Sequence, residues 1–303
     1  MSSLNTQQRC AALIKQMQLP DGFHQVVSNI YLPLSQIILQ RKKDQPLVVS
    51  INGAQGTGKS TMTTFLKQII ESEMKCHVAN LSLDDFYSVR VKRMSLAEKI
   101  HPLFATRGVP GTHDVALLEQ VLDQLVDQQP CKVPRFNKAI DDRCDESEWT
   151  DYSDPVEVIL FEGWCNNSPA QSQQALEKPV NALEENEDPQ GIWRQHVNER
   201  LIDYQQRIFN RADICIMLKA PDFDCIYEWR SLQEEKLKQQ EMQAGSAYLK
   251  QSRVMDASEL ARFIQHYERI SRHTLAHLPK TADIILPVAA DHSITGIVQN
   301  DME

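Results

Sequence analysis

Hydrophobic residues in the first forty positions recur at helical spacing. Between residues 5 and 18, and again between residues 22 and 40, apolar side chains return every three or four positions, which is the spacing of one helix face. They are Cys10, Leu13, Ile14 and Met17 in the first segment, and Val26, Val27, Ile30, Leu34 and Ile38 in the second. The pattern predicts packing helices, and we assign residues 1–45 to this N-terminal segment.

From residue 46 onward, short apolar runs alternate with longer helical patterns. The run 46–52 is rich in β-branched residues and leads into a glycine, which is typical of a strand buried on both faces. The predicted strands are 46–52, 76–83, 156–161, 213–218 and 283–286, and the predicted helices are 58–73, 114–128, 190–209 and 256–278. This alternation predicts an α/β fold, a parallel sheet covered by helices on both faces, with ligands bound at the carboxyl ends of its strands.

Two segments interrupt this regular alternation. The polar stretch 239–252 breaks the periodicity and predicts an irregular excursion, and residues 291–303 are expected to form a C-terminal tail. The main domain is therefore predicted to span residues 46–290.

Composition and charge narrow the class of protein. The 303 residues include 42% hydrophobic and 24% charged side chains, an ordinary soluble composition. The formal charge of −9 excludes a broad face for a phosphate backbone, so nucleic acid is not an expected partner. No segment reaches the ~20 apolar residues of a membrane span, and the N-terminus lacks an export signal.

The cysteines indicate a reducing compartment. Their number, seven, is odd, and no two of them form a Cys-x-x-Cys pair, which favours free thiols over a disulfide framework. We therefore expect a cytoplasmic protein.

The turn after the first predicted strand carries the most informative motif. Residues 53–60 fit the phosphate-loop (P-loop, or Walker A) pattern, and they stand between a buried strand and a helix, the context that makes the pattern informative. Glycines let backbone N–H groups curl around phosphate oxygens, and the helix N-terminus adds about half a positive charge. The expected nucleotide-binding residues are Gly53, Ala54, Gln55, Gly56, Thr57, Gly58, Lys59, Ser60 and Thr61.

Two side chains of this loop have predicted roles. Lys59 would span the β- and γ-phosphates, and Ser60 would bind Mg²⁺. The alternative is a glycine-rich turn that binds no ligand.

Carboxylates follow two other predicted strands at the same edge of the sheet. Asp84 and Asp85 follow the second strand, and Glu162 follows the third. One of the two aspartates is expected to align an attacking hydroxyl or accept its proton, while the other contacts the metal shell or caps a turn. Glu162 stands where P-loop enzymes hold a metal-bound water. The alternative is that these carboxylates are solvated turn residues.

A loop and a basic cluster offer positive charge for an anion. The glycine- and proline-containing loop 106–114 would fix Arg107 and His113 at its base, with Asp114 capping the next helix. Residues 132–138 place three cations, Arg135 among them, around an apolar stripe. A capped helix with a surface histidine, and a solvated rim of charge, are the alternatives.

Together these motifs resemble the small-molecule kinases of the uridine kinase, phosphoribulokinase and pantothenate kinase superfamily. The phosphate loop, residues 82–87 and residues 161–163 occur in the same order and spacing. Within that superfamily, residues 52–61, 82–87 and 101–114 are most similar to the D-glycerate 3-kinase branch. The resemblance extends over about residues 33–287.

The resemblance implies a P-loop NTPase-type fold with ATP and Mg²⁺ as cofactors. It implies that Asp84 is the catalytic base and that Mg²⁺ is held by Ser60 with help from Asp84 and Glu162. Asp85 departs from the Ser or Gly of uridine, ribulose-phosphate and pantothenate kinases, which tilts the prediction away from those three substrates.

Kinases of this kind also close a lid, which the resemblance locates in a helical insertion at about residues 222–258. Arg230 is its candidate for reaching the transferring phosphoryl group. Arg269, Arg272 and His273 on the later helix are either further charge for this site or an exposed polar face.

The acceptor is expected to be a small, anionic molecule. The candidate acceptor-binding residues are Asp85, Tyr87, Arg107, His113 and Arg135. Loop position alone adds Trp164, Asn166, Asn181 and Glu184 as possible pocket residues.

The sequence thus predicts an ATP-dependent kinase in which Asp84, Lys59 and Arg230 are catalytic. Its first-choice reaction converts D-glycerate to 3-phosphoglycerate. Two alternatives stay open: a kinase for another sugar acid, nucleoside or pantothenate-like alcohol, and a regulatory protein that binds ATP without phosphorylating a small molecule.

Overall fold

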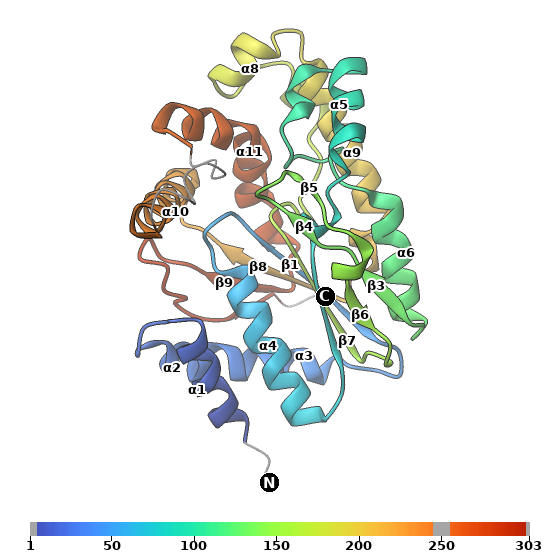
Figure 1. Ribbon diagram of the computed structural model, residues 1–303, viewed down its shortest axis with the longest axis vertical. Coiled ribbons are helices and arrows are strands. Elements are labelled where there is room, and N and C mark those ends of the chain that lie inside the picture. Colours follow the sequence, from blue (N-terminus) through green and yellow to red (C-terminus); the bar gives the residue numbers. More distant parts are fainter. Residues whose placement is uncertain (1–4, 245–254, 301–303) are drawn as a thin grey trace.

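A six-stranded sheet lies at the centre of the computed structural model, which describes residues 5–244 and 255–300 (Figure 1). Its strand order is β10-β9-β8-β1-β7-β2. The strands are β1 (Leu47–Gly53), β2 (Val78–Ser82), β7 (Val158–Gly163), β8 (Ile214–Lys219), β9 (Ile284–Pro287) and β10 (Val298–Gln299). The first five of these run parallel, which confirms the predicted α/β fold.

The far edge of the sheet differs from the prediction. β10 pairs antiparallel with β9, so the sheet is mostly rather than wholly parallel. The backbone N–H of Asn300 also donates to the Asp283 carbonyl at 3.0 Å. Residues 298–300, expected in a tail, therefore extend the sheet.

The two faces of the sheet bury alternate residues of each strand, as the pleat requires. Val49 and Ile51 pack in the cluster formed with the N-terminal helices and the helix after β1. Val48 and Phe161 pack on the opposite face. The first face is covered by α1 (Thr6–Gln16), α2 (Phe23–Val26), the π-helical turn η1 (Val27–Tyr31), α3 (Leu32–Gln40) and α4 (Lys59–Met74), and the second by α5 (Arg90–Lys99), α6 (Val115–Val126) and α9 (Ile192–Arg207).

The N-terminal segment forms helices, as predicted, and they pack on α4. The ring of Phe65 lies 5.3 Å from Phe23 and 5.7 Å from Tyr31 between centroids. These helices share a hydrophobic core with the sheet.

The remaining helices surround the carboxyl edge. They are α7 (Gln173–Leu176), α8 (Ala182–Glu187), α10 (Phe223–Ala244) and α11 (Ala257–His277), and Figure 1 shows α10 beside α11. Asp256 caps α11 by accepting from the N–H groups of Ser258 and Glu259, and Asp114 caps α6 as predicted. Residues 239–244 of the expected excursion continue α10, and 245–252 lie outside the described residues.

The hydrophobic pattern did not predict two small antiparallel pairs or α5, although residues 132–138 resemble the substrate-side hairpin of the kinase family. β3 (Cys131–Val133) pairs with β6 (Thr150–Tyr152), and β4 (Phe136–Asn137) pairs with β5 (Asp142–Arg143). Strands of two or three residues are too short to show an alternating pattern. We refer to residues 136–143 as the β4–β5 hairpin.

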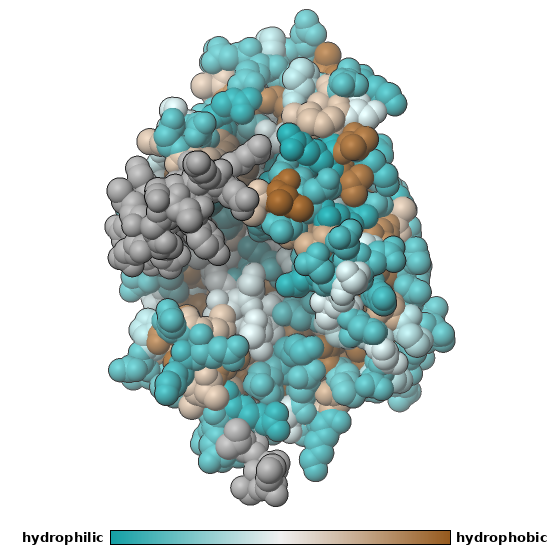
Figure 2. All heavy atoms as spheres, in the orientation of Figure 1, coloured by the Kyte–Doolittle hydropathy of each residue, from teal (hydrophilic) through white to brown (hydrophobic). Residues whose placement is uncertain are grey.

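The surface in the view of Figure 2 is mainly hydrophilic, with hydrophobic residues scattered over it. Across the described ranges, no helix combines the length and apolar character needed to cross a bilayer.

Candidate active site

The P-loop joins the central strand β1 to α4. Gly56 and Gly58 adopt positive φ angles of 83° and 87°, a region that favours glycine. A Cβ on Gly53 would lie 2.7 Å from Thr57 Oγ1, and Thr57 Oγ1 itself donates to the Ala54 carbonyl at 2.8 Å. The loop is therefore folded tightly upon itself.

Helix α4 begins where this loop ends. Its N-cap, Gly58, offers no side chain to the first N–H groups of the helix. Unpaired N–H groups at a helix N-terminus suit an anion such as phosphate. Of the other predicted nucleotide-binding residues, Gln55 lies in the loop and Thr61 in the first turn of α4, both half-buried.

Lys59 lies across the loop that precedes it. Its Nζ donates to the Ala54 carbonyl at 3.1 Å. Burial lowers the pKa of Lys59, and the nearby charges of Glu162 and Asp84 oppose that shift. Lys59, the predicted phosphate-binding lysine, is thus within electrostatic range of Glu162 and Asp84.

Ser60 and Glu162 meet across adjacent elements. Ser60 Oγ donates to Glu162 Oε1 at 2.7 Å, and Glu162 is 7% exposed. The register of β7 pairs Glu162 with Ile51 of β1 and with Ser82 of β2, so the glutamate lies between the P-loop strand and the strand that leads to Asp84.

A hydroxyl and a carboxylate fit Mg²⁺, which prefers oxygen ligands. The described ranges hold no group of three or more His, Cys, Asp or Glu suited to a metal. Mg²⁺ in nucleotide sites is held by one or two carboxylates together with waters and substrate phosphates. The pair of Ser60 and Glu162 matches that arrangement.

Asp84 lies in η2 (Leu83–Phe86), the 3₁₀ turn directly after β2. Its Oδ1 accepts from the Tyr87 hydroxyl at 3.0 Å, and its Oδ2 accepts from Lys138 Nζ at 2.6 Å. Burial raises the pKa of Asp84, but the charge and hydrogen bond of Lys138 lower it below its ordinary value. Asp84 is therefore held ionised.

Asp85 faces the β4–β5 hairpin. Its Oδ1 accepts from the backbone N–H of Phe136 at 3.1 Å, and its Oδ2 lies 3.2 Å from Arg135 Nη1. Burial raises the pKa of Asp85, and the Phe136 N–H and Arg135 oppose that rise. Asp85 and Arg135, both predicted to bind the acceptor, thus fix the hairpin over the end of β2.

Arg107 also holds this hairpin. Its guanidinium pairs with Asp141, a residue of the hairpin turn, and lies 5.6 Å from the Phe136 ring centroid. The buried Arg93 reaches the same aspartate at 3.0 Å. The Tyr267 hydroxyl of α11 donates to the Arg107 carbonyl at 3.3 Å.

His113 lies behind the Asp84 side of the site. Its ring stacks on Tyr87 at 4.5 Å, and its Nδ1 lies 3.0 Å from the Tyr204 hydroxyl. Burial lowers the pKa of His113 to about 3, against the pull of Asp84. His113 is therefore a neutral, buried ring and not the cation that the sequence suggested for an acidic acceptor.

Arg230 lies on α10, and its guanidinium is 5.9 Å from the Phe263 ring centroid of α11. Its charge lowers the pKa of Tyr267, although burial raises that pKa overall. Arg230 is thus on the helix predicted as a lid, within electrostatic range of Tyr267 at the edge of the site.

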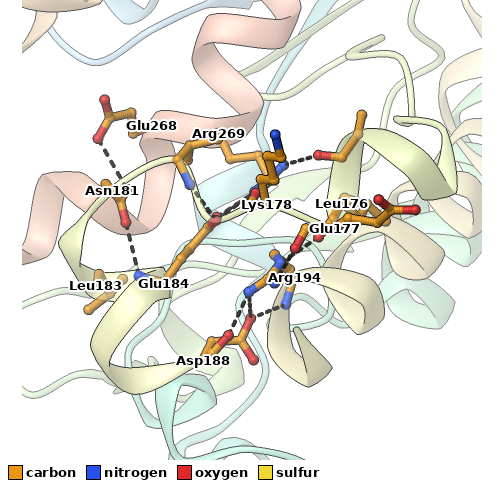
Figure 3. A network of polar contacts seen from close by, with 12 residues as sticks. Leu176, Glu177, Lys178, Asn181, Leu183, Glu184, Asp188, Arg194, Glu268 and Arg269 are labelled. Atoms are coloured by element: carbon orange, nitrogen blue, oxygen red, sulfur yellow. Dashed lines mark hydrogen bonds and ion pairs between the residues drawn. The ribbon is translucent and has the colours of Figure 1, made fainter. Parts of the chain in front are cut away.

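Arg269 is not available as additional charge for the site. Figure 3 shows it turned towards Glu184, and its Nε and Nη2 donate to that carboxylate at 2.7 and 2.6 Å. Glu184 is fully buried, and Asn181 caps α8 by accepting from the Glu184 N–H. Asn181 and Glu184, expected as pocket residues, instead join α8 to α11.

A second buried pair lies in the same region. Arg194 Nη1 is 3.1 Å from Asp188 Oδ2, and Arg194 Nε donates to the Leu176 carbonyl at 2.7 Å (Figure 3). Trp164 and Asn166 likewise bond to the backbone, at the carbonyls of Gly108 and Phe161. These residues support the fold around the site.

Lys138 is a site residue that the sequence alone does not single out. The sequence shows it only as part of a basic cluster, and nothing in one sequence shows which of three cations reaches Asp84 across 54 positions. Tyr204 of α9, which contacts His113, is another residue near the site that the sequence does not single out.

A P-loop with Lys59 and Ser60 at the start of α4 and Glu162 at the adjoining strand end is the arrangement with which P-loop kinases and NTPases bind a nucleotide. The chain is 30% identical over 237 residues to the uncharacterized kinase mug58 of Schizosaccharomyces pombe, covering 75% of this chain and 80% of that protein. It is 32% identical over 213 residues to the chloroplastic D-glycerate 3-kinase of Arabidopsis thaliana, covering 66% of this chain and 43% of that protein.

Solved structures share the fold. The D-glycerate 3-kinase of Cryptococcus neoformans matches with a TM-score of 0.72 and 23% identity, covering 89% of this chain and 99% of that structure. No family model matches the chain. The chain belongs to the P-loop kinase superfamily that includes uridine and pantothenate kinases, with similarity to its glycerate kinase branch, and it is an ATP-dependent phosphotransferase.

Proposed function

We propose that this kinase transfers the γ-phosphoryl group of ATP to a hydroxyl of a small anionic acceptor, and that D-glycerate, giving 3-phosphoglycerate, is that acceptor. The observation that carries the proposal is the placement of Asp84 directly after β2, whose last residue, Ser82, pairs with Glu162 beside the P-loop strand. A hydroxyl beside Asp84 would face the end of a nucleotide held on the P-loop.

The nucleotide side rests on the chain's own donors. Backbone N–H groups of the P-loop and Lys59 would bind the phosphates, and Ser60 with Glu162 would hold Mg²⁺. When bound, Mg²⁺ neutralises charge on the β- and γ-phosphate oxygens. Asp84, at the end of the neighbouring strand β2, would assist at the metal.

On the acceptor side, Asp84 would take the proton of the attacking hydroxyl. The Tyr87 hydroxyl orients this carboxylate through its bond to Oδ1, and His113 supports the Tyr87 ring by stacking. Asp85, Arg107 and Arg135 hold the β4–β5 hairpin over the site. Arg230 is the α10 residue proposed to approach the transferring group.

Two observations favour a negatively charged acceptor. Lys138 and Arg135 pair with Asp84 and Asp85 and are more than half exposed, with side-chain exposures of 59% and 53%, so both cations are accessible to a ligand beside the aspartates. The similarity to a D-glycerate 3-kinase over two thirds of this chain supports the choice of acid.

The test is to supply ATP and Mg²⁺ with D-glycerate, glycerol, uridine or pantothenate in turn, and to identify the phosphorylated product by phosphorus NMR. The proposal predicts that D-glycerate stimulates ADP release the most and yields the 3-phosphate. A different preferred acceptor, or ATP binding with no stimulation by any of the four, would contradict it.

A further inference from the structure

We propose that Lys138 binds the acceptor's carboxylate. Before an acceptor binds, the ammonium of this lysine pairs with the carboxylate of Asp84. The inference rests on the proposed function, because it takes the acceptor hydroxyl to lie at Asp84. The inference assigns to Lys138 the selection of an acid over a neutral alcohol.

Lys138 is placed to contact two partners at once. It follows β4 at the turn of the hairpin, and its Nζ lies 2.6 Å from Asp84 Oδ2. An ammonium group carries three donors, and the 59% exposure of this side chain leaves room for a ligand beside the aspartate.

The other cations of the hairpin region are matched by carboxylates that have no part in the proposed transfer. Arg107 and Arg93 both pair with Asp141, and Arg135 pairs with Asp85. Lys138 differs from them because its partner is the carboxylate that takes part in the reaction.

Phosphoryl transfer removes the counter-ion of Lys138. The acceptor oxygen forms a bond to the γ-phosphorus, the bond from that phosphorus to the β-γ bridging oxygen breaks, and ADP leaves with that electron pair. The hydroxyl proton passes to Asp84, which becomes neutral. The ammonium of Lys138 then keeps a counter-ion only if the substrate supplies one.

A short hydroxy acid fits this demand. In glycerate only two carbon atoms separate the 3-hydroxyl oxygen from the carboxylate carbon, so a lysine in contact with Asp84 is within reach of the carboxylate of an acid whose hydroxyl lies there. Glycerol has a neutral CH₂OH in place of the carboxylate and offers no such partner.

The same contact explains how water is kept from reacting. While Lys138 holds Asp84 Oδ2, that oxygen is partly withdrawn from any other hydroxyl. An acceptor carboxylate draws the ammonium towards itself and opens the oxygen to the acceptor's own hydroxyl. ATP hydrolysis without acceptor is therefore expected to be slow.

The experiment compares Lys138→Met with the wild type, using D-glycerate and glycerol as paired acceptors. Losing a charge-assisted hydrogen bond worth about 1.5–3 kcal/mol corresponds to roughly 10–100-fold. We expect the ratio of kcat/KM for D-glycerate to kcat/KM for glycerol to fall by that factor, and the KM for ATP to stay the same. Hydrolysis of ATP without acceptor should rise.

Two further variants serve as controls. Lys132→Met removes an exposed lysine of β3 from the same basic cluster, and it should keep the wild-type preference for the acid. Lys138→Arg retains the charge and should restore part of that preference.

The outcomes separate this inference from the proposed function. A wild type that phosphorylates D-glycerate, with a Lys138→Met variant that keeps the wild-type ratio of acid to neutral acceptor, overturns the recognition role alone. If Lys138→Met hydrolyses ATP without acceptor at the wild-type rate, the proposal that Lys138 keeps Asp84 from reacting with water is overturned. A wild type that prefers neutral alcohols overturns both the anionic acceptor and the role of Lys138.

Discussion

The phosphate side and the acceptor side of this site are built in different ways. The phosphate side is one continuous segment, β1, the P-loop and α4, and its geometry comes from glycine backbone and a helix N-terminus. The acceptor side joins η2, the β4–β5 hairpin and α11, and it depends on side-chain contacts such as Asp84 with Lys138 and Arg107 with Asp141.

This difference indicates which part of the site can be mutated to change acceptor specificity and which part to change nucleotide binding. A backbone-built phosphate loop tolerates few substitutions, because its function needs N–H groups and positive φ angles. On the acceptor side, an exposed charged residue such as Lys138 can be exchanged without altering the sheet. Specificity should therefore depend on the hairpin and nucleotide binding on the loop.

The largest expected effect on stability comes from breaking the buried ion pair between Glu184 of α8 and Arg269 of α11. Glu184→Gln would leave the buried Arg269 guanidinium without its counter-ion, which costs about 3–5 kcal/mol. Urea unfolding should show a free energy of unfolding lower by about that amount.

The matched control is Glu187→Gln on the same helix. Glu187 pairs with Arg262 at 2.6 Å, but its side chain is 41% exposed, and exposed pairs contribute about 0–1 kcal/mol. Equal losses in the two variants would contradict the distinction between a buried support and a surface pair.

A smaller effect is expected at the phosphate side. In Gly56→Val a Cβ would lie 2.8 Å from Trp229 Cβ, at a φ of 83°, and the backbone strain alone is about 1–3 kcal/mol. ATP affinity measured by calorimetry should fall about 10–100-fold, because each 1.4 kcal/mol is tenfold.

Gly22→Ala is the control for this loss. A Cβ added to Gly22 would meet no heavy atom within 4 Å, and the φ of this residue is −61°, so the variant should bind ATP like the wild type. Wild-type affinity in Gly56→Val would show that the loop does not need its left-handed glycine.

The smallest predicted effect is a pH dependence of stability from His113. Burial holds its pKa at about 3 in the folded protein, against 6.5 as the ordinary value. Between these values the unfolded chain binds the extra proton, so acidification below pH 6.5 lowers the free energy of unfolding by up to about 1.4 kcal/mol per pH unit.

Comparing His113→Gln with the wild type isolates the contribution of His113 to the pH dependence of stability. Between pH 6.5 and 5.5 its free energy of unfolding should fall less steeply than that of the wild type, by about 1 kcal/mol. Parallel curves for the two proteins would mean that His113 is protonated in the fold.

The sequence predicted the phosphate side better than the acceptor side for a physical reason. The β1 pattern, the glycine loop and the α4 helix are contiguous, and carboxylates at strand ends follow from the parallel sheet, so Ser60 and Glu162 were expected to meet. Local pattern is sufficient where the backbone itself makes the site.

The acceptor side combines residues whose proximity only the folded chain shows. Lys138 meets Asp84 over 54 positions, and Arg107 meets Asp141 over 34. Two-residue strands leave no periodic signal for the hairpin. Arg269 was expected either to supply charge to the site or to lie on an exposed polar face, and it does neither, because it is buried against Glu184, 85 positions away.

The most direct test of the account is turnover and ATP binding measured together in Asp84→Asn. The account predicts that transfer to the preferred acceptor falls about 100- to 10,000-fold, the range for loss of a general base, while ATP affinity stays within about twofold of the wild type. Turnover that is unchanged in this variant would contradict the claim that the acceptor hydroxyl is aligned by Asp84 beside the P-loop.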